Sequence, residues 1–197
     1  MNFINNELRD MIGELNESKG WHDEPRSIAQ HCILLHSEVS EIVEDYRSNK
    51  AIDEVWYEYK NENGEIVTSD SKYSFQSFID GSIRYEHEKR LTGKPCGIPS
   101  ELADVVIRAL DMAYEYDYSL SIDELRKSNS VSFEEIISNI HYFISMMFYY
   151  NDLSYLDLVI STCFMISNEK GINLEQQIKD KIEYNKTRPI KHGGKRL

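Results

Sequence analysis

Two pairs of carboxylates have the residue types and spacing that suit metal chemistry. Glu38 and Glu41 form the first pair, and Glu101 and Asp104 form the second. Residues three apart share one face of an α-helix, so each pair can hold a cation from one side. Two such helices packed side by side would bring four oxygen ligands together, which is the donor set that Mg²⁺ and Mn²⁺ prefer. The spacing therefore predicts a site for Mg²⁺, with Mn²⁺ as the alternative, between two helices.

The helices that must position these pairs are indicated by two apolar repeats. The apolar positions are Ile28, Cys32, Leu35, Val39, Ile42 and Tyr46 in the first, and Leu102, Val105, Val106, Ala109 and Ala113 in the second. At about 100° per residue, both acidic pairs lie roughly 80–160° to the same side of their own apolar stripe. This repeated geometry predicts a shared site, whereas a solvated acidic face is the alternative for either pair alone. A ferritin-type di-iron site needs Glu-x-x-His on two helices, and no histidine lies three residues after a glutamate.

The composition is typical of an acidic, soluble globular protein. The 197 residues are 41% hydrophobic and 28% charged, with a formal net charge of −12. That charge argues against binding a nucleic acid polymer or an anionic membrane surface. Three widely separated cysteines suit neither a disulfide framework nor a zinc knuckle, and no apolar stretch is long enough to span a bilayer. With no apolar signal core after Met1, these features predict a cytoplasmic protein.

The predicted fold class is all-α, a helical bundle in a single domain over residues 1–197, with a small β-hairpin insertion. Helices are expected over residues 3–18, from Pro25 to about Tyr46, over 75–91 with a bend near Gly81, over 99–118, which Ser100 can cap, and over 133–150, 155–168 and 174–184. The hairpin is expected over residues 55–68, with Asn63-Gly64 at its turn, and residues 92–97 are expected to be a loop.

An aromatic residue and several cations are candidates for contacting a ligand. Trp21 would either pack as a lead-in to the next helix or form an aromatic wall for a planar base. Arg108 lies on the same side of its helix as the acids, a position that also suits a surface or packing residue. The basic tail at residues 185–197 has no acidic side chain and would either complement a helix dipole or clamp a phosphate. The candidate phosphate ligands in the tail are Lys186, Arg188, His192 and Lys195.

Five segments taken together carry a family pattern. They are Lys19-Gly20-Trp21 through Pro25-Arg26, Leu35 to Glu41, Gly97 to Arg108, Tyr184 to Pro189, and His192-Gly193-Gly194-Lys195. In this combination the chain resembles the MazG-like nucleotide pyrophosphohydrolases, which belong to the all-α nucleoside triphosphate pyrophosphatases. The resemblance implies an all-α, Mg²⁺-dependent enzyme that cleaves a nucleoside triphosphate to the monophosphate and pyrophosphate.

The resemblance also assigns roles to individual residues. The positions that match the family's metal ligands are Glu38, Glu41, Glu101 and Asp104. Trp21 matches an aromatic residue that lies near the base in relatives. Related enzymes are helical dimers or tetramers, which implies a homo-oligomer, most simply a homodimer, with its site near a subunit interface. The chain departs from compact members by insertions at about residues 51–96 and 121–170, and these insertions leave the four acids in place.

The resulting hypothesis is a metal-dependent nucleotide pyrophosphohydrolase. A divalent cation would lie between the carboxylates and the anionic triphosphate, where it neutralises charge and aligns the phosphates. Glu41 is favoured over Glu38 to position or deprotonate the attacking water, and Arg108 or the tail cations would stabilise charge in the transition state. Two alternatives stay open: a helical-bundle interaction protein whose 133–168 hairpin binds a partner, and a nucleotide-binding sensor without turnover.

Overall fold

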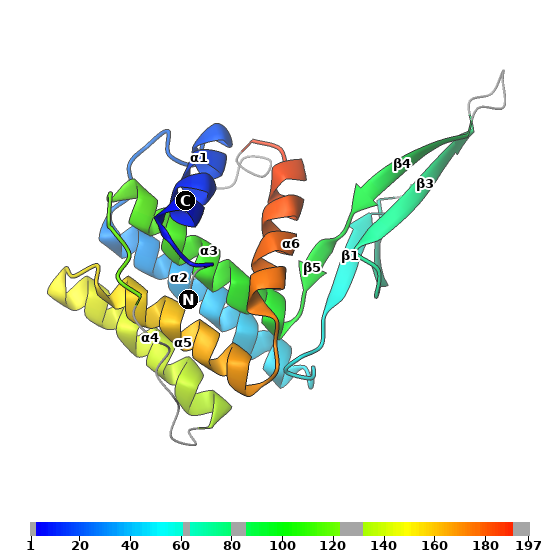
Figure 1. Cartoon of the computed structure of the whole chain (residues 1–197). Helices are drawn as coiled ribbons and strands as arrows, with labels where there is room; N and C mark the ends of the chain where they lie inside the picture. Colours follow the sequence, from blue (N-terminus) through cyan, green and yellow to red (C-terminus); the bar gives the residue numbers. More distant parts are fainter. Residues whose placement is uncertain (1–2, 61–63, 80–85, 123–131, 191–197) are drawn as a thin grey trace.

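The computed structural model describes residues 3–60, 64–79, 86–122 and 132–190. Its helices are α1 (Asn6–Ser18), α2 (Ile28–Arg47), α3 (Ile98–Glu115), α4 (Phe133–Tyr150), α5 (Tyr155–Glu169) and α6 (Leu174–Thr187). Its strands are β1 (Trp56–Lys60), β2 (Ile66–Ser69), β3 (Tyr73–Ile79), β4 (Glu86–Thr92) and β5 (Lys94–Cys96). The helices form one body and the strands extend from one side of it (Figure 1). The prediction of a mostly helical protein is confirmed.

Helix α3 lies at the centre of the body and contacts α1, α2, α5 and α6. Its sequence is rich in small and branched apolar residues, and Leu102, Val106 and Leu110 are fully buried. Because other helices cover α3 on several sides, its polar side chains lie against those helices. Away from water, they require hydrogen-bond or ion-pair partners on them. The central position of α3 therefore decides which groups can meet at the predicted site.

The start of α3 is set by backbone geometry rather than by a side-chain cap. The helix begins at Ile98, and Pro99 lies in its first turn, where a missing N–H costs nothing. Gly97 precedes it with φ 103°, a left-handed conformation that glycine adopts without strain. A Cβ at Gly97 would clash with the carbonyl oxygen of Glu54. The prediction that Ser100 caps α3 is wrong, because Ser100 lies within the helix and is buried.

The strands form two antiparallel units, a three-stranded sheet and a two-stranded ribbon. In the sheet, β1 lies between β2 and β5. The β1–β2 pairing aligns Tyr57 with Ser69 and Lys60 with Ile66, which confirms the predicted hairpin. The ribbon consists of β3 and β4 and projects away from the helical body (Figure 1). The β insertion is thus larger than the single hairpin predicted from the sequence.

Two predictions for this insertion are wrong. The segment expected as a bent helix forms β3 and β4, in which Tyr73 pairs with Thr92. Aromatic and β-branched residues at the start of this segment favour a strand, and Asp80-Gly81, which lies outside the described residues, is a hairpin-turn sequence. Residues 94–96, expected as part of a loop, form β5 and pair with β1.

Polar contacts fix the β insertion against α6. The Lys72 ammonium lies 2.6 Å from Oδ1 of Asp180, and the Tyr57 hydroxyl donates to Oδ2 of the same carboxylate at 3.0 Å. Lys72 and the Tyr73 hydroxyl also contact Glu183, one turn further along α6. Asp180 is buried, and these partners satisfy its two carboxylate oxygens. The contacts hold the insertion next to α6 and to the start of α3.

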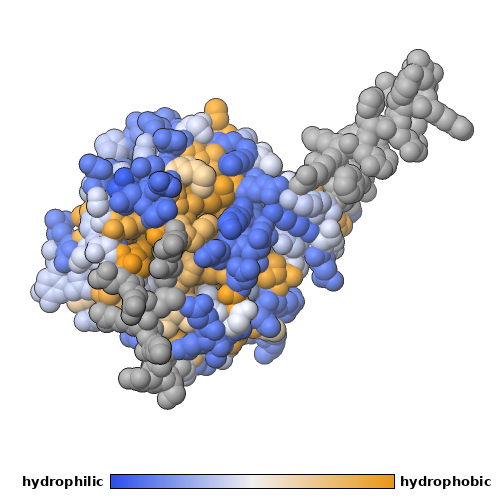
Figure 2. Space-filling view, viewed as in Figure 1, coloured by the Kyte–Doolittle hydropathy of each residue, from blue (hydrophilic) through white to orange (hydrophobic). Residues whose placement is uncertain are grey.

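The α4–α5 hairpin completes the body by packing α4 on α2 and α5 on α3. Several aromatic side chains of α4 stay exposed, among them Tyr142, Phe148 and Tyr149. On the face shown in Figure 2, hydrophilic residues interrupt the hydrophobic ones. Within the described ranges, no helix is both long and apolar enough to cross a membrane.

Candidate metal centre

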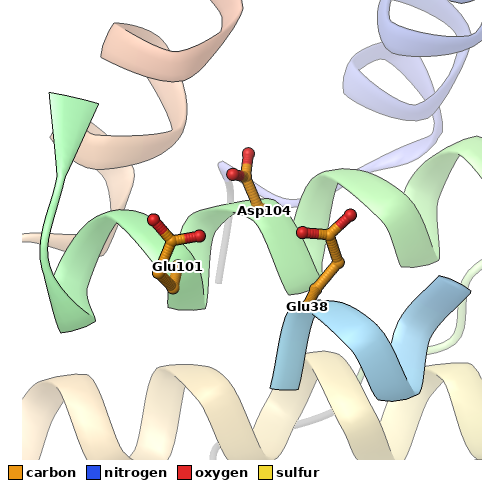
Figure 3. Close-up of side chains that lie close together, drawn as sticks. All are labelled: Glu38, Glu101 and Asp104. Atoms are coloured by element: carbon orange, nitrogen blue, oxygen red, sulfur yellow. The ribbon is translucent and has the colours of Figure 1, made fainter. Parts of the chain in front are cut away.

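Three of the four predicted acids meet between α2 and α3. Glu38 of α2 and Glu101 and Asp104 of α3 each offer a carboxylate oxygen, and these oxygens lie within 4.8 Å of one another. Figure 3 shows the two α3 carboxylates beside that of Glu38, which extends from α2. The two helices pack through their apolar stripes, so the acids that flank the stripes come together. We call these three residues the carboxylate cluster.

Burial makes the two glutamates of the cluster, Glu38 and Glu101, costly to ionise. Removal from water raises the pKa of Glu101 to about 8, although the Lys181 ammonium opposes the shift. Burial also raises the pKa of Glu38, against the attraction of the Arg108 guanidinium. Oε2 of Glu101 is buried without a hydrogen-bond partner in the part of the chain that the structure describes. A bound cation would favour the ionised carboxylates and satisfy this oxygen.

Two protein cations already lie against the cluster. Nη2 of Arg108 donates to Oε1 of Glu38 at 2.9 Å. Nζ of Lys181, on α6, lies 2.5 Å from Oδ2 of Asp104 and 3.6 Å from Oε1 of Glu101. Burial alone would lower the pKa of Lys181, but the two carboxylates outweigh it and raise the pKa. Charged groups of α2, α3 and α6 therefore interact with one another at the cluster.

A cavity of about 350 Å³ opens beside the cluster, and we call it cavity A. Six residues singled out from the sequence line it: Trp21, Glu38, Glu41, Asp104, Arg108 and Arg188. Its apolar lining includes Leu34 and Ile107, and Tyr184 adds a second aromatic ring. An aromatic wall, carboxylates and cations thus surround one volume, which is a lining suited to a ligand with a planar ring and an anionic chain.

Glu41 lines cavity A but lies outside the carboxylate cluster. It is exposed, and it forms no ion pair with any described residue, whereas Arg108 pairs with Glu38. The structure therefore separates the four acids into three that converge and one that faces the same cavity from α2.

Trp21 forms part of the wall of cavity A, and a buried contact holds the segment that carries it. Nε2 of the neighbouring His22 lies 2.9 Å from Oδ1 of Asp111 on α3. Asp111 is 1% exposed, so its contact with His22 is shielded from water. The guanidinium carbon of Arg26 lies 5.6 Å from the centre of the Trp21 ring. These contacts tie the aromatic wall to the central helix.

The tail residues have different positions. Arg188 follows the last residue of α6 and lines cavity A. Lys186 is exposed and does not line it. His192 and Lys195 lie outside the described residues. Of the two predicted tail ligands that the structure describes, Arg188 lines cavity A and Lys186 does not.

Sequence reasoning missed Lys181 and Lys94, which both line cavity A. Lys181 lies four residues before Asn185, a spacing that places both on one face of α6, and Arg188 follows three residues later, just after the helix ends. That helical spacing could have been used to predict that Lys181 lies near Arg188. Lys94 lies in the segment expected as a loop, and the pairing of β5 with β1, together with the contacts of β5 with α6 and α3, gives it a fixed position.

A second cavity, also about 350 Å³, lies between α2 and the sheet, and we call it cavity B. It shares Ser37, Glu41 and Lys94 with cavity A, and its walls include Glu101 and Trp56. The two cavities therefore adjoin at the carboxylate cluster.

Comparisons with protein-family models, curated proteins and solved structures found no match to this chain. The arrangement of the site is the basis for a function. Its parts can hold a divalent cation at the carboxylate cluster, stack a planar ring on Trp21 and pair phosphate oxygens with Arg188.

Proposed function

We propose that this protein is a Mg²⁺-dependent nucleoside triphosphate pyrophosphohydrolase of the MazG-like kind, which releases a nucleoside monophosphate and pyrophosphate. The observation that carries the proposal is the convergence of Glu38, Glu101 and Asp104 beside a cavity lined by Trp21 and Arg188. Solvated acidic faces do not bury carboxylates against one another, because like charges in a low dielectric repel strongly.

The donor set fits Mg²⁺, with Mn²⁺ as the alternative. The cluster offers hard oxygen ligands from two helices, and the buried Oε2 of Glu101 lacks a partner among the described groups. Glu38, Glu101 and Asp104 would hold the cation. When bound, the metal supplies charge neutralisation and polarisation of the phosphate oxygens.

The other residues of cavity A have separable tasks. Trp21 would stack on the base, and Arg188 would pair with phosphate oxygens in a charge-assisted contact. Arg108 orients Glu38 through its hydrogen bond and would stabilise the charge that develops during phosphoryl transfer. Glu41 would accept a proton from the attacking water as its oxygen bonds to phosphorus and the phosphoanhydride bond breaks.

We also propose a cytoplasmic homodimer. The cysteines Cys32, Cys96 and Cys163 are free and buried, as in a protein kept in a reducing compartment. The exposed aromatic residues of α4 and the resemblance to oligomeric enzymes support self-association. Light scattering at micromolar protein should give twice the chain mass, and a monomer alone would contradict the assembly.

The decisive experiment screens the purified protein against a panel of nucleoside triphosphates with saturating Mg²⁺ and measures pyrophosphate release. At least one nucleotide should be hydrolysed, and removal of the metal by a chelator should stop the reaction. Glu38→Gln should lower turnover by at least about a hundredfold, since loss of a metal ligand removes charge stabilisation. The amide keeps an oxygen for Arg108, so the helical circular dichroism should remain.

Glu24→Gln is the matched control, because Glu24 is exposed and lies outside the cavities and the carboxylate cluster. It should leave turnover unchanged. Full activity of Glu38→Gln would contradict the site. Mg²⁺-dependent nucleotide binding without turnover by the unsubstituted protein would identify a sensor instead.

A further inference from the structure

Lys94 is held at the junction of cavities A and B by the β insertion. It is the first residue of β5, and the antiparallel register places it opposite Glu58 of β1. The chain then passes through Gly97 into α3, whose first turn carries Glu101. This short connection ties the position of Lys94 to that of the carboxylate cluster.

The backbone that carries Lys94 is fixed from two sides. Strand β5 pairs with β1 and also contacts α6 and α3. Tyr57, the β1 residue opposite Pro95, donates to the buried carboxylate of Asp180 on α6. A rigid support of this kind holds a side chain more precisely than a free loop does.

Lys94 differs from two other cations of cavity A in its pairing. Arg108 is committed to Glu38, and Lys181 is committed to Asp104. Lys94 lines both cavities, yet no carboxylate of a described residue lies within 4.0 Å of its ammonium. Several carboxylates, among them Glu58 and Glu101, share the walls of cavity B with Lys94. A partly buried lysine that is not committed to one of them at ion-pair distance is free to pair with an anion that enters the cavity.

We propose that Lys94 is a phosphate-binding residue, supplied by the β insertion, which contacts the polyphosphate chain where cavities A and B adjoin. This inference rests on the proposed function, since it places the same anionic ligand in cavity A. Arg188 lines cavity A at the end of α6, and Lys94 comes from the sheet, so the two cations reach the cavity from different elements. The β insertion thereby gains a role in ligand binding.

Inorganic triphosphate with Mg²⁺ is the appropriate probe, because it tests phosphate binding without depending on the base. Isothermal titration calorimetry on the full chain should show that Lys94→Met binds it at least about tenfold more weakly. Lys94→Arg, which keeps the charge, should recover most of the affinity. Lys60→Met is the control, because Lys60 is an exposed residue of the neighbouring strand β1 and lines neither cavity.

With a nucleotide that the protein hydrolyses, Lys94→Met should raise KM more than it lowers kcat. Lys94→Gln repeats the comparison in a polar variant if Lys94→Met lowers Tm. Wild-type affinity in both neutral variants would overturn the role of Lys94 while leaving the proposed function intact. Triphosphate binding that depends on Lys94 without any turnover would support this inference and overturn the proposed function. No triphosphate binding by the unsubstituted protein would overturn both.

Discussion

The ammonium of Lys181 on α6 lies 2.5 Å from Oδ2 of Asp104 on α3, and its side chain is 3% exposed. The contact joins the last helix to the central helix at the carboxylate cluster. The buried ammonium depends on this carboxylate, since Lys181 left alone would be a charge stranded away from water, whereas Asp104 is partly exposed. Asp104 therefore has a structural task in addition to the metal-binding role proposed for it.

Lys181→Met should destabilise the protein strongly. It leaves Asp104 and Glu101 without their ammonium partner, and losing one member of a buried pair costs about 3 kcal/mol. For a chain of this size that corresponds to a fall in Tm of about 10 °C. Differential scanning calorimetry in a chelator measures it, with exposed Lys170→Met as the control. Equal Tm values for the two variants would show that the pair contributes nothing to stability.

Metal affinity should rise with pH because Glu101 must lose a proton to bind a cation. Its folded pKa of about 8 lies above the unfolded value of 4.5, so the native state holds the extra proton between these values. Without metal, stability contributed by the protonated form is therefore lost as pH rises towards 8. Calorimetric Mn²⁺ affinity should increase about tenfold between pH 6.5 and 7.5, with proton release. An affinity that is flat over this range would contradict the assignment of Glu101 as a ligand.

The His22–Asp111 contact should stabilise the protein most at low pH. The hydrogen bond to Asp111 raises the pKa of His22, although burial opposes it. The contribution is complete below the unfolded pKa of about 6.5 and is lost as pH rises through the higher folded value. The Tm deficit of His22→Gln should thus be larger at pH 6 than at pH 9. A deficit that grows with pH would show that the neutral imidazole, not the cation, makes the contact.

The same substitution should disturb the aromatic wall, since His22 adjoins Trp21 and anchors its segment to α3. Tryptophan fluorescence reports this change, and Trp56→Phe in both proteins isolates the Trp21 signal. A red-shifted emission in the His22→Gln background is the expected result. Unchanged emission would mean that other contacts suffice to hold Trp21.

The pairing of α2 with α3 was predictable because it depends on local periodicity. Each helix has an apolar stripe at helical spacing, and Glu38 and Glu101 flank their stripes on corresponding sides. When the two stripes are buried against each other, the acids that flank them are brought close together. Glu41 was harder to place, since a few degrees of helix rotation decide whether a flanking side chain joins the cluster or faces the cavity.

Contacts between distant segments explain what the sequence did not reveal. The β3–β4 segment contains helix-compatible spacings beside its strand-favouring residues, and the cross-strand register decides between the two. Lys94 reaches the site because β5 pairs with β1, and Lys181 does so because α6 packs on α3. The residue pattern within β5 or α6 does not indicate which strand or helix that element packs against.

Arg188 and Lys186 form a matched pair of cations for testing the basic tail. Arg188 lines cavity A, whereas Lys186 is exposed outside it. Truncation after Tyr184 would be ambiguous, because Nζ of Lys19 donates to the carbonyl oxygens of Lys186 at 3.0 Å and Arg188 at 2.7 Å. Removing those carbonyls would also release the end of α6 from the end of α1, which mixes structure with binding.

Side-chain substitutions keep these backbone contacts. Arg188→Met should weaken binding of Mg²⁺-triphosphate by about tenfold or more, because a charge-assisted contact contributes about 1.5–3 kcal/mol and 1.4 kcal/mol is a factor of ten. Lys186→Met should change the affinity less than about twofold, as expected of an exposed charge screened by solvent. Calorimetric titration of both variants under one condition gives the comparison. Equal weakening by the two would assign the effect to the general positive charge of the tail rather than to a contact in cavity A.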